Sequence, residues 1–311
     1  MNNSEIKRII KISVLLIVIA VGFALLSAKI NGGSILKVDK EVSVLTGKGN
    51  IDEIKEFDMS SIKDISVDTV SSDVNVILSK DNNIKVHFYG TASEMSKAPK
   101  LEATLNGDKL NISIKHSKQI MSIVNFALST KLDVYIPESY KKSMDIKTVS
   151  GEVSMDELQF DGFKVHTVSG DVDINSIVAS TTDFGSVSGS IDIKAISSKS
   201  NGFETTSGDV KIDSITGDIK ANSVSGSITA IYKEFNNDIQ AETVSGDVKL
   251  SLPQDSAFNI DFSTMSGDLD NEFPLVVTGK IEKRNIKGTV GDGQKTIRVE
   301  TVSGDATLNK K

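Results

Sequence analysis

Carboxylates recur at equivalent positions of this chain, each directly after a glycine. They are Asp171, Asp209, Asp218, Asp247, Asp268 and Asp305. Repeated Asp in glycine-containing turns is the pattern by which nonapeptide β-rolls bind Ca²⁺. Those rolls carry more glycines and place the Asp farther along, whereas Ser190 and Ser227 interrupt the series here. We therefore interpret these carboxylates as solvated turn residues and expect no metal ligand among them.

Histidine and serine could supply a metal ligand, a general base or a nucleophile. The three histidines, His87, His116 and His166, lie in separate strand-like stretches, and the chain has no HExxH or other close ligand pair. A serine nucleophile needs one activated side chain beside a base, whereas serines recur here at equivalent turns. We expect the histidines to face solvent from strands and the serines to be structural, with no catalytic residue.

Residues 288–296 (GTVGDGQKT) superficially resemble a phosphate-binding loop. A P-loop has lysine directly after its last glycine, but Gln294 separates Gly293 from Lys295. Residues 296–302 alternate like a strand, so no helix N-terminus is present to complete a phosphate site. We predict a glycine-rich hairpin or crossover and no nucleotide cofactor.

One short repeat surrounds the carboxylates and organises most of the chain. Ser or Thr precedes a glycine, and apolar residues follow two and four positions later, as in TVSGDV at 167–172. The repeat glycines are Gly151, Gly170, Gly189, Gly208, Gly217, Gly226, Gly246, Gly267 and Gly304. The first four are nineteen residues apart and Gly208, Gly217 and Gly226 are nine apart, so we expect a larger repeat to hold two short units. Regular spacing of this size is typical of stacked arrays, and we predict a parallel β-solenoid, or β-helix-like, fold.

The apolar residues before and after each glycine have opposite parity. Val165 lies five residues before Gly170, for example, and Val172 lies two residues after it. A strand changes faces only at a kink, bulge or corner, and glycine is the natural residue there because it tolerates positive φ. Residues 69–74 (TVSSDV) look like an early copy of the repeat in which Ser72 replaces the glycine.

Composition excludes several classes of protein. The 311 residues are 38% hydrophobic but only 5% aromatic, without Trp, which favours thin aliphatic β layers over a deep ligand pocket. A net charge of -7 and a pI near 5.2 argue against a nucleic acid partner, because phosphate binding needs a basic face. The absence of cysteine excludes disulfide scaffolds and Cys-based zinc or iron–sulfur sites.

The N-terminus predicts a membrane anchor. The run Ile12–Ala28 contains no charged residue, and with its apolar neighbours it is just long enough to cross a bilayer. Basic residues in the tail 1–11 place the N-terminus in the cytoplasm and the remainder outside the cell membrane. The alternative is a cleaved signal peptide, but cleavage after Ala28 would put Leu26 where a small residue is preferred. We favour an uncleaved, single-pass anchor over residues 12–30.

The remainder divides into a linker over 31–50 and a β-repeat ectodomain over 51–308, less regular over 51–145 and repetitive over 146–308. Alternation predicts early strands near residues 65–67, 74–78, 84–89, 110–114 and 132–136. Residues 117–129 carry apolar positions at helical spacing. Such a helix could bind a partner or lie on the membrane, but we favour a plug that covers an open end of the β core.

Strand–proline signatures connect the chain to a known family. They are LDVYIP (132–137) before IKTVSG (146–151) and VKLSLP (248–253) before FSTMSG (262–267). The close of the domain is also similar, with GTVGDG (288–293) before IRVETVSG (297–304). In these segments the chain resembles a bacterial domain family of unknown function, named "putative adhesin", that includes LiaG-like cell-envelope proteins. The resemblance covers roughly residues 51–308 and departs from the family at the insert 117–129 and at Ser72. It implies a β-solenoid-like ectodomain, often behind one transmembrane helix, with an adhesive or envelope-stress role and no catalytic residues.

We therefore expect a non-enzymatic cell-surface protein that presents its solenoid to a cell-wall polymer or to another envelope protein. An accessory sensor of envelope stress is the alternative, and it would need a membrane partner because the short tail holds no output domain. A polysaccharide lyase or hydrolase would need carboxylates, or Arg and Lys, clustered in one groove, and it is disfavoured because arginine occurs only at Arg8, Arg284 and Arg298.

Overall fold

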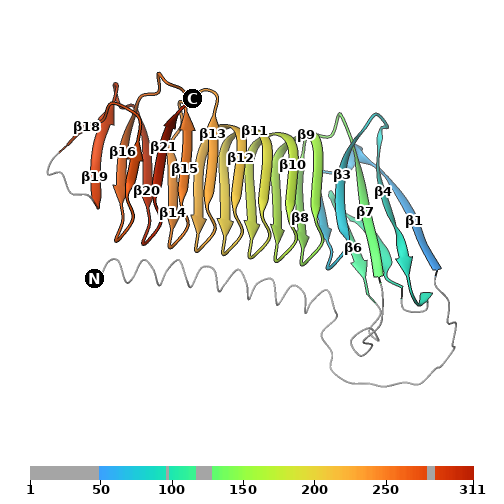
Figure 1. Ribbon diagram of the computed structural model, residues 1–311. Coiled ribbons are helices and arrows are strands. Elements are labelled where there is room, and N and C mark those ends of the chain that lie inside the picture. Colours follow the sequence, from blue (N-terminus) through green and yellow to red (C-terminus); the bar gives the residue numbers. More distant parts are fainter. Residues whose placement is uncertain (1–48, 96–97, 117–127, 279–283) are drawn as a thin grey trace.

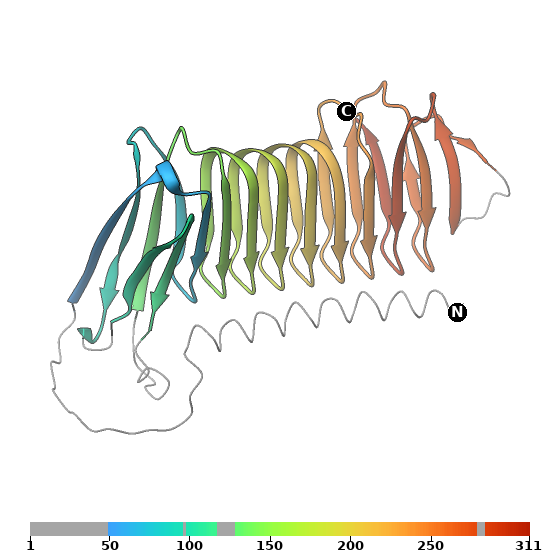
Figure 2. The same ribbon diagram turned by 180° about the vertical axis from the view of Figure 1, so that it is seen from behind.

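The computed structural model of the protein describes residues 49–95, 98–116, 128–278 and 284–311. These residues form 21 strands and one short 3-10 helix, and all the strands join one sheet that coils along the molecule (Figures 1 and 2). The predicted all-β class is therefore confirmed. The elements are β1 (Gly49–Asp58), η1 (Met59–Ser61), β2 (Asp64–Asp68), β3 (Asp73–Ser79), β4 (Asn83–Ala92), β5 (Lys100–Asn106), β6 (Lys109–Lys115), β7 (Leu128–Pro137), β8 (Ser143–Thr148), β9 (Val153–Thr167), β10 (Val172–Ser186), β11 (Ile191–Thr205), β12 (Val210–Ser223), β13 (Ile228–Tyr232), β14 (Ile239–Thr243), β15 (Val248–Leu252), β16 (Phe258–Ser263), β17 (Leu269–Asn271), β18 (Val276–Val277), β19 (Asn285–Val290), β20 (Lys295–Glu300) and β21 (Ala306–Lys310).

The predicted anchor, Ile12–Ala28, lies outside the described residues, as do residues 117–127 of the predicted helix. In the described part of the chain, no helix is long and apolar enough to cross a membrane. The last two residues of the predicted helix, Leu128 and Ser129, instead begin β7, because they pair with β4 in an antiparallel ladder. Strand β1 likewise begins at Gly49, within the predicted linker, because its first residues pair with the end of β4.

The middle of the molecule is a parallel solenoid built on the nineteen-residue repeat. Val153, Val172, Ile191 and Val210 occupy one register position on β9, β10, β11 and β12, which pair in parallel in that order. A four-residue turn joins each of these long strands to the next. Figure 1 shows the turns of successive coils in a row along one edge. The spacing of the glycines therefore did predict how the coils stack.

The residues that point into the core shift from odd to even positions at the turn that follows Val165 and Thr167. Before the turn at Gly170, Val165 and Thr167 point inward, and after it Val172 and Ile174 do, all at most 2% exposed. Aromatic side chains contact one another from coil to coil. Phe184 and Phe203 occupy equivalent positions and stack with ring centroids 5.4 Å apart, and Phe163 meets Phe184 in a tilted arrangement with centroids 6.0 Å apart. Burial of these apolar columns stabilises the solenoid.

The N-terminal part departs from the predicted parallel arrangement. Strands β1, β4 and β7 pair antiparallel, and so do β5 and β6. Only two residues, Gly107 and Asp108, connect β5 to β6, and a connection this short permits only antiparallel pairing. Strands β2 and β3 pair in parallel with β8 and β9, so the irregular part continues directly into the solenoid.

The order of the last coils in space differs from their order in sequence. Strand β20 lies between β14 and β16, and β21 lies between β15 and β17. Strands β20 and β21, which come last in the sequence, therefore lie between the coil of β14 and β15 and the coil of β16 and β17. Because β19 and β20 flank β16, residues 291–294 cross over its first residues. Gly291 and Gly293, with φ of +62° and +63°, allow this passage, so the predicted glycine-rich segment is a crossover.

Candidate functional site

Eight of the nine repeat glycines form a single column along the edge of tight turns. In spatial order they are Gly151, Gly170, Gly189, Gly208, Gly226, Gly246, Gly304 and Gly267. A Cβ on any of them would lie 2.0–2.1 Å from a backbone carbonyl oxygen of the adjacent coil. None of the eight has a positive φ. Positive φ is therefore the wrong reason for these glycines, which are needed because the turns stack too closely for any side chain.

Gly217 does not belong to this column. It lies within β12, where it has φ +98° and where a Cβ would clash with the carbonyl oxygen of Ser198. The pairing of β11 with β12 skips one residue here, because Thr216 pairs with Ser197 but Asp218 pairs with Ser200. The coil that contains Gly217 is therefore one residue shorter than its neighbours. Gly217 lies at the resulting bulge, a position where glycine is expected.

Buried hydroxyl groups hold the backbone of each turn. Thr148 and Thr167 accept hydrogen bonds from the N–H groups of Gly151 and Gly170 at 3.0 and 2.9 Å. Thr205, Ser223 and Thr243 instead donate to the carbonyl oxygens of their turn glycines at 2.6–2.7 Å. Ser72, the serine in the early copy of the repeat, forms the end of the glycine column, where its hydroxyl lies 2.7 Å from that of Thr130.

Two equivalent serines give a matched test of these hydroxyl groups. Ser223→Ala removes the 2.6 Å bond to Gly226 and should lower the free energy of unfolding by about 1–2 kcal/mol. Ser186→Ala should change it by less than about 0.5 kcal/mol, because the buried Ser186 hydroxyl has no partner in the described part of the chain. Urea denaturation followed by circular dichroism measures both. Equal shifts of the two midpoints would show that the hydroxyls contribute nothing specific.

The turn carboxylates bind the backbone of the neighbouring coil. Asp171 and Asp209 accept hydrogen bonds from the N–H groups of Ser190 and Ser227 at 2.8 and 2.7 Å. Asp305 bonds to the N–H of Asp268 in the same way at 2.8 Å. Among the described residues, no group of three or more His, Asp or Glu is placed to hold a metal ion. The geometry therefore gives these carboxylates a role in joining adjacent coils.

The structure does not bring the three histidines together. His87 on β4 contacts Asp52 of β1 at 2.8 Å. His166 on β9 lies 3.8 Å from Asp183 of β10. His116 follows β6, and burial lowers the pKa of its imidazole. Each histidine therefore has its own surroundings, and the chain does not assemble them into one catalytic group.

One extended surface, here called the polar ladder, consists of outward-facing residues on the strands that precede the turns. Its first column is Asp145, Lys164, Asp183, Gly202, Lys220, Gln240, Arg298, Asp261 and Lys287. Its second column is Lys147, His166, Gly185, Glu204, Asn222, Glu242, Glu300, Ser263 and Asn285. Neighbouring rungs are about 4.8 Å apart, the spacing of paired strands. The ladder therefore presents a regular row of hydrogen-bonding groups across nine strands.

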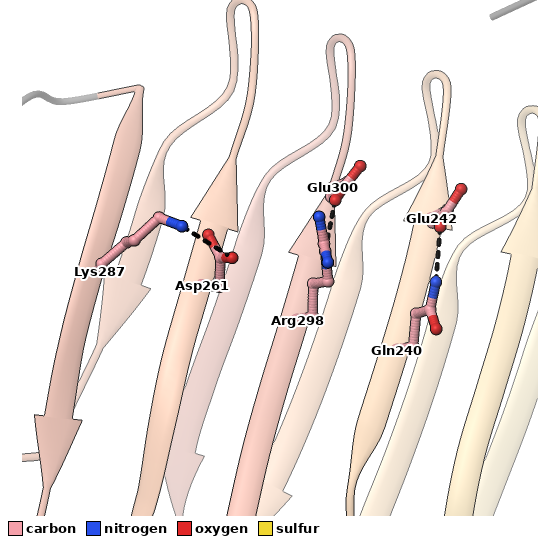
Figure 3. Close-up of polar contacts among 6 residues, drawn as sticks. All are labelled: Gln240, Glu242, Asp261, Lys287, Arg298 and Glu300. Atoms are coloured by element: carbon pink, nitrogen blue, oxygen red, sulfur yellow. Dashed lines mark hydrogen bonds and ion pairs between the residues drawn. The ribbon is translucent and has the colours of Figure 1, made fainter. Parts of the chain in front are cut away.

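Contacts within the polar ladder fix its side chains. Figure 3 shows this at the C-terminal end, where Lys287 of β19 contacts Asp261 of β16 at 3.1 Å. On β20, Arg298 Nε lies 2.5 Å from Glu300, and on β14 the Gln240 amide donates to Glu242 at 2.7 Å (Figure 3). The hydrogen bond and charge of Glu300 raise the pKa of Arg298. Exposed pairs of this kind add little stability, but they orient the groups that a partner would meet.

Burial affects charged groups nearer the middle of the polar ladder. The pKa of Glu204 is raised, chiefly by burial and then by the nearby charge of Asp183. This surface was not predicted from the sequence. The nineteen-residue spacing of Lys164 and Asp183 could have revealed it, since equivalent positions of successive coils share a column.

A separate polar recess lies beside the bulge at Gly217 and has a volume of about 460 Å³. It is lined by Ser198, Lys199, Thr216, Gly217, Asp218, Glu234, Asn236, Asn237 and Lys295. Asp218 accepts a hydrogen bond from the N–H of Asp238 at 2.9 Å, and Asp238 accepts one from the N–H of Thr296 at 2.8 Å. These acidic side chains therefore connect three consecutive coils beside the recess.

Comparison with known proteins identifies the family. The family model described as Toastrack DUF4097 matches residues 62–309, most of the chain, and confirms the resemblance stated from the strand–proline signatures. No curated protein sequence matches the chain. Among solved structures, a "putative adhesin" from Bacteroides fragilis NCTC 9343 is 12% identical, covers 86% of this chain and 100% of its own, and has a TM-score of 0.43. A "putative adhesin" from Parabacteroides merdae ATCC 43184 is 10% identical, with coverages of 84% and 96% and a TM-score of 0.44. A "Putative lipid binding protein" from Parabacteroides distasonis ATCC 8503 is 15% identical, with coverages of 82% and 96% and a TM-score of 0.42.

Proposed function

The chain belongs to the Toastrack DUF4097 family, and from that premise we propose that it is a non-enzymatic interaction module of the bacterial cell surface. The solenoid binds a cell-wall polymer or another envelope protein. The uncharged run Ile12–Ala28 holds it at the cell membrane, with the N-terminus inside and the solenoid outside.

The polar ladder is the observation that carries this proposal. It crosses nine strands at a spacing of about 4.8 Å, and its side chains are held by contacts such as that of Lys287 with Asp261. A rigid row of paired charges, amides and hydroxyls suits an extended partner that makes many weak contacts, because their free energies sum along its length. Acidic and basic groups are mixed along its first column, which favours a partner bound by hydrogen bonds over one bound by net charge.

Crosslinking at the polar ladder tests the proposal. A photoreactive amino acid replaces Lys220 in the full-length protein, expressed in a bacterium with an intact envelope. A second protein carries the probe at Glu138, an exposed residue outside the ladder. We expect adducts with wall material or with one envelope protein at position 220 and far fewer at position 138. Equal labelling at both positions, together with no retention of the protein by purified walls, would contradict the proposal.

A further inference from the structure

A short coil followed by a long one forms a step in the solenoid, on the edge away from the glycine column. The turn glycines are nineteen residues apart up to Gly208, then eighteen apart to Gly226 and twenty apart to Gly246. The missing residue is at Gly217, midway between two turns, where the pairing of β12 with β11 skips one position. In the next coil, residues 233–238 connect β13 to β14 at the same level. The polar recess beside Gly217 lies at this step.

Buried side chains hold the backbone of the short coil in place. The Asn201 amide donates to the carbonyl oxygens of Thr216 and Asp218 at 3.2 and 3.1 Å. The buried Tyr232 hydroxyl donates to the carbonyl oxygen of Gly217, which lies between them, at 3.0 Å. Three consecutive carbonyl groups are thus bonded to side chains. The recess is therefore shaped before any ligand arrives, which reduces the entropy lost on binding, and bulges of this kind are common beside functional sites.

Four side chains that line the recess have no partner in the described part of the chain. Lys199, Glu234, Asn236 and Asn237 make no hydrogen bond or ion pair there. Lys199 and Glu234 are exposed and supply one charge of each sign, and the two amides offer both donors and acceptors. The recess therefore differs from the C-terminal end of the polar ladder, where charged groups already contact one another (Figure 3).

A second lysine and a second carboxylate complete the charge of the recess. Lys295 lies 3.8 Å from Asp238, too far for a hydrogen bond, so its ammonium group keeps its donors. Asp218 lines the recess with Glu234, so two carboxylates balance Lys199 and Lys295. The lining has no net charge but carries separate positive and negative groups, which favours a ligand with both charges over a polyanion or a polycation.

We propose that the recess binds a short peptide that has a free carboxylate and a free ammonium group. The carboxylate accepts hydrogen bonds from Lys199 and Lys295, and the ammonium group donates to Glu234. The asparagine amides match the donor and acceptor of the peptide groups between these two ends. The volume of about 460 Å³ falls within the range of about 300–1,000 Å³ that is usual for small-molecule sites.

This inference deepens the proposed function by naming a chemical class of ligand, and it rests on that function only for the natural source of the peptide. Isothermal titration calorimetry on the full-length protein in detergent tests it directly. The probes are trialanine, trialanine amide, which lacks the carboxylate, and N-acetyl-trialanine, which lacks the ammonium group. We expect trialanine to bind and each blocked peptide to bind at least fivefold more weakly, because each loses charge-assisted hydrogen bonds.

Variants of the two unpartnered charges assign each end of the peptide. Lys199→Gln should weaken trialanine at least threefold but leave trialanine amide unchanged, because the amide has no carboxylate to lose a contact. Glu234→Gln should weaken trialanine at least threefold but leave N-acetyl-trialanine unchanged. Both residues are exposed, so the melting temperature should not move. Lys249→Gln, an exposed lysine on β15 outside the recess, is the control and should bind all three peptides normally.

Failure of trialanine to bind, equal binding of the blocked peptides, or unchanged binding by both variants would overturn the inference. Crosslinking at position 220 separates this result from the proposed function. If trialanine does not bind but the adducts at position 220 still form, only the peptide site is wrong and the proposed function stands. If trialanine binds as expected but no adducts form and purified walls do not retain the protein, the site stands and the proposed function is wrong.

Discussion

Gly208→Ala is expected to lower the free energy of unfolding by about 3 kcal/mol, near the top of the usual range for an overpacked core. The new Cβ would lie 2.0 Å from the carbonyl oxygen and 2.7 Å from the carbonyl carbon of Gly189. Both atoms belong to the backbone of the adjacent coil, so no side-chain rotation relieves the contact. Urea denaturation followed by circular dichroism measures the loss as a lower midpoint at an unchanged slope.

Gly162→Ala is the matched control for this substitution. Gly162 lies on β9, in the same solenoid, but a Cβ there meets only the Ser143 and Thr181 hydroxyls, at 3.4 and 3.7 Å. These are ordinary contacts, and we expect a change within about 0.5 kcal/mol, or a small gain from the reduced freedom of the unfolded chain. If Gly208→Ala and Gly162→Ala unfolded at the same urea concentration, close stacking of the turns would not be what requires glycine.

Asn201→Leu should also destabilise the solenoid strongly, by about 3 kcal/mol. Asn201 is fully buried, and its Oδ1 accepts hydrogen bonds from the hydroxyls of Thr182 and Ser198 at 2.9 and 2.8 Å. Its Nδ2 donates to the carbonyl oxygens of Thr216 and Asp218 at 3.2 and 3.1 Å. Leucine has a similar volume but cannot bond any of these four groups, and an unsatisfied buried group such as the Thr182 hydroxyl costs about 1–3 kcal/mol.

Asn222→Leu, on the neighbouring strand β12, is the control. Asn222 belongs to the polar ladder and faces outward, so its replacement should change stability by less than about 0.5 kcal/mol. Thermal and urea unfolding of both variants, compared with the unchanged protein, separate the two cases. A midpoint for Asn201→Leu close to that for Asn222→Leu would show that the buried amide does not hold the shortened coil together.

The solenoid was predictable because its information is local and repeated. Each coil closes on the same turn, so the spacing from Gly151 to Gly170 directly measures the length of one coil. Gly217 was misassigned because the shortened coil places it midway between Gly208 and Gly226, where it resembles one more turn. Spacing alone does not distinguish a turn that stacks on its neighbours from a bulge within a strand.

The order of the C-terminal coils was not predictable from local pattern. TVSGDA at 301–306 resembles every other turn of the chain, and nothing in it says whether it follows β15 or β17. That order depends on pairing between distant segments and on the crossover at Gly291 and Gly293. The antiparallel N-terminal part likewise depends on the two-residue connection at Gly107, which alternation of apolar residues does not reveal.

The candidate surfaces were harder to foresee than the fold. Single residues such as His166 are visible in the sequence as candidates for chemistry, whereas the polar ladder arises only when residues nineteen positions apart are aligned in columns. Pairing between β4 and β7 likewise brings His87 opposite Asp133, although the two residues are far apart in sequence. Such surfaces follow from long-range register, so periodicity within one strand does not indicate them.

Protease shaving of intact cells, with released peptides identified by mass spectrometry, tests most directly whether the solenoid is displayed outside the membrane. We predict release of peptides from residues 49–311, while residues 1–11 stay protected until the cells are lysed. Protection of the solenoid in intact cells, with digestion after lysis, would contradict surface display and the proposed function with it. A mature chain that begins near Lys29 would show a secreted protein in place of a tethered one.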